Sequence, residues 1–134
     1  MENAKDTKYK ILFLDDDEFV TDMYSHKFSG AGHDFHAVSD AESALEELRN
    51  GFEPDAIVTD LIMPKIDGFG FLKLLKEEDL VGNSAVIVLS NQGETEDLTR
   101  ARELGAIGHI IKANTIPTEV LGIITELIRK HKSK

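Results

Sequence analysis

Short runs of apolar residues alternate along this chain with longer stretches in which apolar residues recur every three or four positions. The recurrence is typical of amphipathic helices, and the short runs are typical of buried strands. The predicted strands are residues 10–14, 33–38, 55–59, 85–89 and 107–111. Strands that alternate with helices in this way are typical of β–α units. The pattern therefore predicts an α/β domain, (βα)5, built on a five-stranded, doubly wound parallel sheet.

The predicted helices have recognisable start and stop signals. Their expected N-caps, for the first three helices, are Asp17, Asp40 and Asp67. In the first helix, the apolar residues that we interpret as core are Phe19, Met23 and Phe28. The fourth helix has a narrow apolar stripe, and the last helix is expected from about residue 117 to residue 129.

Length and composition limit the class of protein. A chain of 134 residues has the length of one domain, which we expect at residues 8–131 between flexible ends at 1–7 and 132–134. With 41% hydrophobic and 30% charged residues, it is neither a disordered chain nor a membrane protein. It contains no cysteine, which excludes disulfides and thiolate chemistry.

The net charge of the chain limits the classes of partner that we expect it to bind. Lys and Arg number 15 against 25 Asp and Glu, a formal net charge of −10. Such a charge repels phosphate backbones and anionic lipid, so we expect no nucleic acid partner and no membrane partner. The chain shows no membrane-spanning run and no secretory signal, so the cytoplasm is the expected location.

Charged and hydroxyl residues follow four of the predicted strands, at the point where each strand ends. They are Asp15, Asp16, Asp17, Asp60, Ser90 and Lys112. Ligands of open α/β sheets bind beyond the carboxyl ends of the strands, so this edge is the candidate site. Clustered carboxylates repel one another unless a cation is bound, and Mg²⁺ prefers oxygen ligands. The sequence therefore predicts a magnesium site here.

The remaining residues of this edge suit a phosphoryl group. Lys112 supplies a positive charge and Ser90 a hydroxyl donor to phosphoryl oxygens. Asp60, the central carboxylate, is then placed to act as a nucleophile and become an aspartyl phosphate. Catalysis would consist of positioning and charge neutralisation.

The chain resembles the receiver domains of two-component response regulators, and in particular the stand-alone, chemotaxis-regulator-like ones. The resemblance extends from about residue 8 to residue 129. Its matching segments are ILFLDDD at 11–17, DAIVTDLIMPKIDG at 55–68, VIVLS at 86–90, and Gly105-Ala106 before Lys112. The resemblance implies a flavodoxin-like strand order, 2-1-3-4-5, and a signalling domain that is not an enzyme, with its output through another protein.

The resemblance also implies a role for each site residue. Asp60 would be the phosphoacceptor. The ligands of Mg²⁺ would be Asp15, Asp16, Asp60 and the backbone carbonyl of Ile62. Ser90 and His109 would be switch residues, with Lys112 as the salt-bridge partner of the phosphoryl group, and Asp17 a helix N-cap. The implied partners are a sensor histidine kinase or histidine phosphotransfer protein, and a downstream target protein.

Two positions depart from the usual receiver pattern. Ala113 follows Lys112 where receivers usually have a proline, often after a cis peptide bond, and alanine seldom holds a cis bond. His109 stands where a tyrosine or phenylalanine is common. Ile62 and Gln92 border the expected path of the hydrolytic water, and an apolar side chain there is expected to slow hydrolysis.

Other interpretations remain open from the residues alone. The chain could be a receiver-like scaffold that binds partners without phosphorylation. The segment Leu14-Asp15-Asp16-Asp17 also resembles the nucleophile strand of haloacid-dehalogenase-type phosphatases, in which Asp15 would react and Asp60 would have no role. Ser90 could also cap the helix that follows it.

Overall fold

The computed structural model describes residues 7–91 and 93–133. Its five strands form one parallel sheet in the order β2-β1-β3-β4-β5, as predicted. The strands are β1 Lys10–Leu14, β2 Asp34–Val38, β3 Ala56–Thr59, β4 Ala85–Ser90 and β5 Gly108–Ile111. Each bound lies within one residue of its prediction, because a parallel sheet covered on both faces buries continuous apolar runs.

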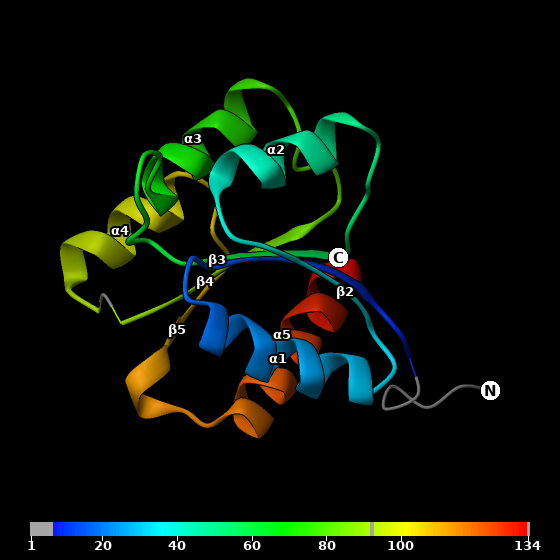
Figure 1. Ribbon diagram of the computed structural model, residues 1–134. Coiled ribbons are helices and arrows are strands. Elements are labelled where there is room, and N and C mark those ends of the chain that lie inside the picture. Colours follow the sequence, from blue (N-terminus) through cyan, green and yellow to red (C-terminus); the bar gives the residue numbers. More distant parts are fainter. Residues whose placement is uncertain (1–6, 92, 134) are drawn as a thin grey trace.

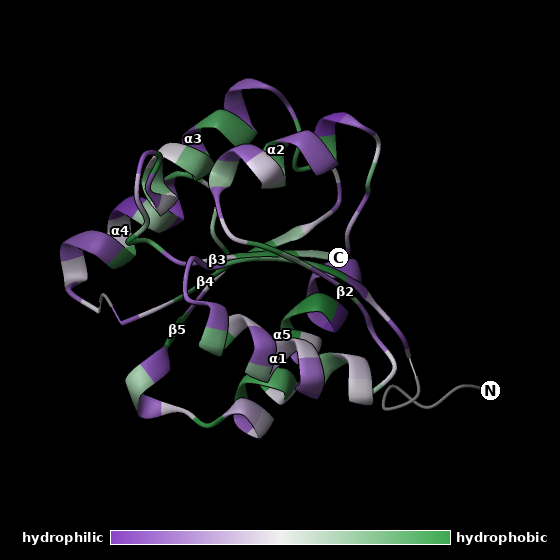
Figure 2. Cartoon of the chain, viewed as in Figure 1, coloured by the Kyte–Doolittle hydropathy of each residue, from purple (hydrophilic) through white to green (hydrophobic). Residues whose placement is uncertain are grey.

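Helices cover both faces of the sheet (Figure 1). One face is covered by α1 Glu18–Gly30 and α5 Pro117–Lys132, and the other by α2 Ala41–Arg49, α3 Gly68–Glu77 and α4 Thr95–Glu103. A 3-10 turn, η2 Lys112–Asn114, joins β5 to α5. The apolar residues gather on the strands and on the helix faces turned toward them (Figure 2).

The predicted N-caps are confirmed. The carboxylates of Asp17, Asp40 and Asp67 accept hydrogen bonds from the main-chain N–H groups of Val20, Ser43 and Gly70. In contrast, α4 begins at Thr95 and has Glu94 at its N-cap position, without a side-chain cap. Ser90 belongs to β4 and does not cap α4, so that interpretation was wrong.

The core assignment in α1 is correct at Phe28 and wrong at Phe19 and Met23. Phe28 is fully buried, whereas Phe19 is 79% exposed and Met23 is 37% exposed. The buried stripe of α1 contains Tyr24 and Phe28, which are four positions apart and pack against the strands. Phe19 and Met23 are also four positions apart, but their stripe is offset by one residue from the stripe of Tyr24 and Phe28. One residue corresponds to about 100° around the helix, so this second stripe lies on a face open to solvent.

The end of α5 differs from the prediction. The helix continues to Lys132 instead of ending near Arg129, and the Lys132 ammonium group pairs with Asp55 Oδ1 at 2.7 Å. Lys132 was expected in a flexible end, and this ion pair ties it to the start of β3. The expected flexible ends at 1–6 and 134, and Gln92, lie outside the described residues. Across residues 7–91 and 93–133, no helix has the length and apolarity to cross a membrane.

Candidate functional site

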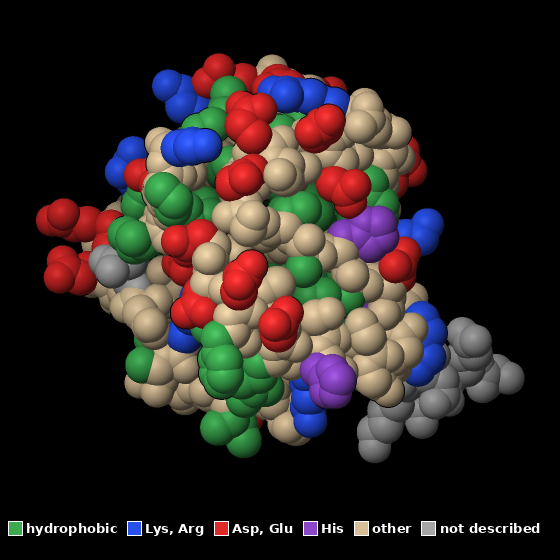
Figure 3. Space-filling view, viewed as in Figure 1, with side chains coloured by type: hydrophobic (Ala, Val, Ile, Leu, Met, Phe, Trp, Pro, Cys, Tyr) green, Lys and Arg blue, Asp and Glu red, His purple; other side chains and the backbone are tan. Residues whose placement is uncertain are grey.

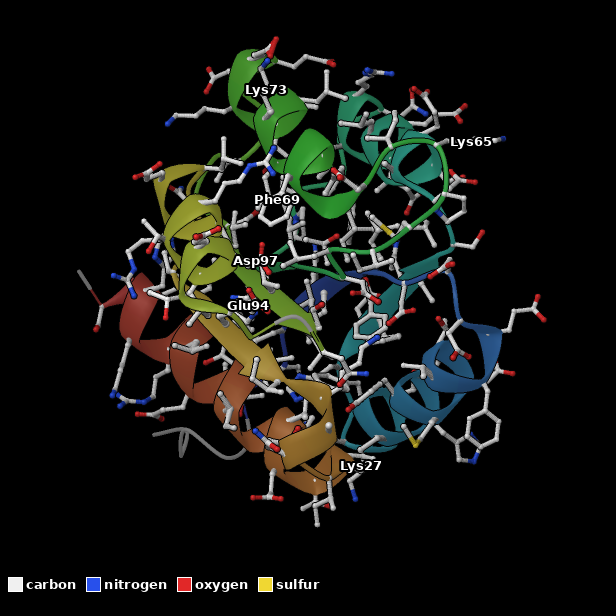
Figure 4. All side chains as sticks on the ribbon, turned by 90° about the vertical axis from the view of Figure 1, so that its left-hand side faces the viewer. Lys27, Lys65, Phe69, Lys73, Glu94 and Asp97 are labelled. Carbon is white, nitrogen blue, oxygen red and sulfur yellow. The ribbon has the colours of Figure 1, made fainter. Side chains whose placement is uncertain are left out.

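The carboxyl ends of the strands bring the predicted charged residues together. Asp15 and Asp16 follow β1 and Asp60 follows β3, and one carboxylate oxygen of each lies within 4.8 Å of the others. In Figure 4, which looks onto this edge, α1 with Lys27 lies on one side of the strand ends, and Asp97 of α4 with the N-cap residue Glu94 lies on the other. The parallel sheet therefore assembles the acidic cluster that the sequence predicted.

Lys112, which follows β5, reaches into this cluster. Its Nζ lies 2.5 Å from Asp15 Oδ2 and 3.0 Å from Asp60 Oδ2. The side chains are largely withdrawn from water, with 15% of Lys112, 1% of Asp15 and 13% of Asp60 exposed. One ammonium group thus bridges two carboxylates of the cluster.

Burial and pairing shift the pKa values in this cluster. Burial raises the pKa of Asp15, although hydrogen bonds from Lys112 and from the Asp17 N–H oppose the shift. For Lys112, burial alone would lower the pKa, but hydrogen bonds to Asp15 and Asp60 outweigh it, and the pKa is raised. Lys112 therefore remains charged, and the buried Asp15 carboxylate and the partly buried Asp60 carboxylate share its single positive charge.

The Asp60 carboxylate is fixed at both oxygens. Oδ1 accepts hydrogen bonds from the main-chain N–H groups of Leu61 and Ile62 at 2.7 and 3.3 Å, and Oδ2 accepts from Lys112. Neutral and cationic donors thus hold the group in one orientation. Such preorganisation favours a nucleophile that must face an incoming group.

Gly68 supports the position of Asp60, and sequence reasoning missed this role. Its N–H donates to the Leu61 carbonyl at 2.9 Å. A Cβ on Gly68 would lie 2.2 Å from the Asp60 main-chain oxygen, which no side chain can do without displacing the chain. The signal in the sequence was a glycine directly after the Asp67 cap, at the point where α3 meets the loop that follows Asp60.

The acidic cluster fits a hard divalent cation. Asp15, Asp16 and Asp60 offer carboxylate oxygens close enough to share one ion, and Mg²⁺ prefers such ligands. Asp16 is exposed, which leaves one side of the cluster open to solvent. Asp17, as predicted, serves as the N-cap of α1. Ile62 lies at the cluster through its N–H, and metal binding by its carbonyl stays a prediction.

The two predicted switch residues occupy different places. Ser90, 1% exposed, ends β4 opposite Ile111, the residue before Lys112. His109 lies on β5, where it borders a small cavity together with Leu98 and Ala101 of α4. Ser90 therefore lies beside the strand end that leads to Lys112, and His109 lies beside α4. Their switch roles stay predictions.

The Lys112–Ala113 peptide bond is trans, as expected for alanine. The Ala113 N–H donates a hydrogen bond to Asn91 Oδ1 at 2.9 Å. Sequence reasoning missed Asn91, because no local pattern indicates a contact between two loops 22 positions apart.

Three comparisons with known proteins agree. The family model described as the response regulator receiver domain matches residues 11–121. The alkaline phosphatase synthesis transcriptional regulatory protein PhoP of Bacillus subtilis is 31% identical over 121 residues, 90% of this chain and 49% of PhoP. The receiver domain of Francisella response regulator 1452 is 29% identical with a TM-score of 0.80, over 92% and 98% of the two chains.

Chemotaxis protein CheY4 of Vibrio cholerae shares the fold, with a TM-score of 0.82 at 24% identity over 90% of this chain and 99% of that one. The chain spans about half the length of curated relatives such as PhoP. The expectation that it acts without an attached effector domain stays a prediction.

Proposed function

Because the chain belongs to the family of response regulator receiver domains, we propose that it is a phosphorylation switch in which Asp60 accepts a phosphoryl group from a phosphohistidine of a partner protein. The observation that carries the proposal is the setting of Asp60. Its carboxylate is fixed by two main-chain N–H groups and Lys112, beside Asp15 and Asp16. This setting gives Asp60 a fixed orientation and a nearby positive charge.

The transfer step is a displacement at phosphorus. A carboxylate oxygen of Asp60 forms a P–O bond while the P–N bond of the phosphohistidine breaks, and its electron pair returns to the ring nitrogen. The histidine leaves as neutral imidazole when its other ring nitrogen carries a proton. Hydrolysis later breaks the P–O bond, as water supplies the oxygen of inorganic phosphate and the Asp60 carboxylate is regenerated.

Each neighbouring residue has a part in this step. Lys112 provides positive charge against the phosphoryl oxygens, and Ser90 provides a hydroxyl donor at the adjacent strand end. Asp15, Asp16 and Asp60 would hold Mg²⁺, which when bound supplies further neutralisation of phosphoryl charge. Lys112 then has to exchange Asp15 for the incoming group.

The partner has to dock on the surface of the domain, and a partly apolar groove is available for it. Phe19, Met23, Pro117 and Leu121 line a groove between α1 and α5, which we call the α1–α5 patch. Figure 3 shows hydrophobic side chains gathered over the starts of these two helices, with carboxylates above them. An exposed apolar patch suits a protein partner. We assign it to the histidine kinase or histidine phosphotransfer protein.

The output surface is assigned to α4 and its neighbours. All residues of α4 are described, and Ala101 alone among them is buried. Arg100 lies over the ring of Phe69, 4.1 Å from its centroid, and supplies a contact with α3 that does not bury α4. Weak anchoring of this kind suits an element that shifts when Asp60 is phosphorylated and so changes the affinity of a target protein. The proposal includes a cytoplasmic location.

Two other readings explain less. A scaffold without phosphorylation leaves the assembled set of Asp15, Asp16, Asp60 and Lys112 without a purpose. A phosphatase that reacts through Asp15 gives no role to Asp60, whose carboxylate is held by two main-chain N–H groups and by Lys112. The placement of Asp60 therefore favours the switch.

The test is intact-mass analysis after incubation with acetyl phosphate and Mg²⁺, followed by mapping of the modified residue. We expect one added phosphoryl group on Asp60, no modification of Asp60→Asn, and no modification of the wild type in EDTA. Equal modification of the wild type and Asp60→Asn would contradict the proposal. Turnover of a phosphate monoester that depends on Asp15 but not on Asp60 would favour the phosphatase.

A further inference from the structure

The departure at Ala113 creates a hydrogen bond that a proline could not make. The Ala113 N–H donates to Asn91 Oδ1 at 2.9 Å. Proline has a fixed φ but no N–H. The turn after Lys112 therefore has no proline ring to restrict its main chain. The hydrogen bond between Ala113 and Asn91 restricts it instead.

The two residues stand next to residues of the site. Asn91 directly follows Ser90 at the end of β4, and Ala113 directly follows Lys112 in η2. Because β4 and β5 are neighbouring strands, the hydrogen bond joins the loops that leave two adjacent strand ends.

A second contact lies between the loop after β4 and the end of β5. A Cβ built on Gly93 would lie 3.0 Å from Ile111 Cδ1, so the main chain at Gly93 packs closely on that side chain. Ile111 precedes Lys112 and Ala113 follows it. The loop after β4 thus holds the chain on both sides of the lysine.

We propose that Asn91 is a positioning residue for Lys112. Its amide oxygen fixes the main chain of η2, and so directs the long lysine side chain between Asp15 and Asp60. A lysine side chain has four rotatable bonds, and its ammonium group bridges two carboxylates well only from a fixed starting point. The inference rests on the proposed phosphorylation of Asp60, in which Lys112 supplies the charge.

The first experiment compares Asn91→Ala with the wild type at saturating Mg²⁺. We expect the initial rate of phosphorylation by acetyl phosphate to fall about two- to tenfold, the range that one hydrogen bond supports. In a ¹H–¹⁵N spectrum recorded without Mg²⁺, the Lys112 ammonium signal, which persists only while the group is held in its ion pairs, is expected to disappear. The Ala113 amide is expected to exchange faster.

Matched variants separate positioning from a general effect on the loop. Asn91→Asp keeps an acceptor oxygen in the same place and is expected to restore the ammonium signal and most of the rate. Asn114→Ala makes the same chemical change on an exposed residue of η2 and is expected to leave both readouts unchanged. In a Lys112→Met background, Asn91→Ala is expected to cause no further loss of rate.

A rate and ammonium signal in Asn91→Ala that equal those of the wild type overturn the proposal. The proposal is also overturned if Asn91→Ala slows phosphorylation as much in the Lys112→Met variant as in the wild type, since Asn91 would then act independently of Lys112. Failure of the proposed function gives a different result. The wild type then stays unmodified, and the ammonium signal still decides whether Asn91 positions Lys112.

Discussion

The ammonium nitrogen of Lys112 lies 2.5 Å from Oδ2 of Asp15, a carboxylate whose side chain is 1% exposed. Asp15 is also one of the three residues able to share a cation. Lys112 and Mg²⁺ are therefore expected to compete for the Asp15 carboxylate. We expect the lysine to stabilise the domain without metal and to weaken its affinity for Mg²⁺.

Lys112→Met tests this competition. We expect the free energy of unfolding in EDTA to fall by about 2–3 kcal/mol, because buried carboxylates lose their counter-charge. We also expect Mg²⁺ to bind several-fold more tightly, seen as a larger rise in Tm with added Mg²⁺. Lys73→Met, at a lysine 72% exposed, is the control and is expected to change neither quantity. Unchanged Mg²⁺ affinity in Lys112→Met would show that the two cations do not compete.

Gly68→Ala is expected to destabilise the domain by about 2–4 kcal/mol, because its Cβ would overlap the main chain of Asp60. Gly122→Ala is the matched control. Gly122 lies in α5 with nothing within 4 Å of an added Cβ, so alanine is expected to stabilise the helix by about 0.5–1 kcal/mol. Urea unfolding of both variants measures the difference. A Gly68→Ala variant as stable as the wild type would mean that the loop after Asp60 adjusts freely.

The α1–α5 patch is tested by Phe19→Ser and Met23→Ser. For transfer from a phosphohistidine partner we expect KM to rise about tenfold, since truncation of an apolar interface anchor costs on the order of 1–2 kcal/mol. The effect on phosphorylation by acetyl phosphate is expected to be much smaller. Ile123→Ser, at another exposed apolar residue of α5, is the control. Equal slowing with the phosphohistidine partner and with acetyl phosphate would show that the substitutions disturb the phosphorylation site and not the docking of the partner.

Ile62 is 60% exposed beside Asp60, where an apolar side chain is expected to hinder the hydrolytic water. Ile62→Asn is expected to shorten the lifetime of the phosphoryl group, measured as the decay of the phosphorylated mass after removal of the phosphodonor. A lifetime equal to or longer than that of the wild type would contradict this role.

His33 makes stability depend on pH. Burial, with a smaller contribution from Lys8, lowers the pKa of His33 below its ordinary 6.5, and its Nδ1 accepts the Tyr9 N–H at 3.0 Å. The unfolded chain then binds a proton before the folded one, so His33 stabilises the fold fully above pH 6.5 and loses this contribution as the pH falls. We expect urea midpoints to decrease from pH 7.5 to 5.5 and the slope to lessen in His33→Asn. The exposed control His26→Asn is expected to keep the wild-type slope, and equal slopes in all three proteins would exclude His33.

Sequence reasoning placed Asp15, Asp60 and Lys112 in one site because parallel strands align their carboxyl ends. That rule needs only strand identity and order. It could not choose between two stripes of α1 with the same spacing, one with Phe19 and Met23 and one with Tyr24 and Phe28. Which stripe is buried depends on how the helix is rotated against the sheet, and that rotation is fixed by packing.

The contact between Asn91 and Ala113 was beyond sequence reasoning for another reason. It joins two exposed loops through a single hydrogen bond, and neither residue type indicates its partner. The sequence shows that no proline follows Lys112, but this observation indicates only that the conformational restriction of a proline ring is lost. That the Ala113 N–H acts as a hydrogen-bond donor to Asn91 is seen only in the folded structure.

Asp15 and Lys112 stand 97 positions apart, and the lysine follows the last strand of the sheet. A nascent chain that has not yet reached β5 holds its carboxylates without their lysine. Under the proposed function, Asp60 would therefore become competent for phosphorylation only after β5 has been synthesised and has docked at the edge of the sheet. The long separation would then restrict phosphorylation to the folded domain, because fragments that end before β5 lack Lys112.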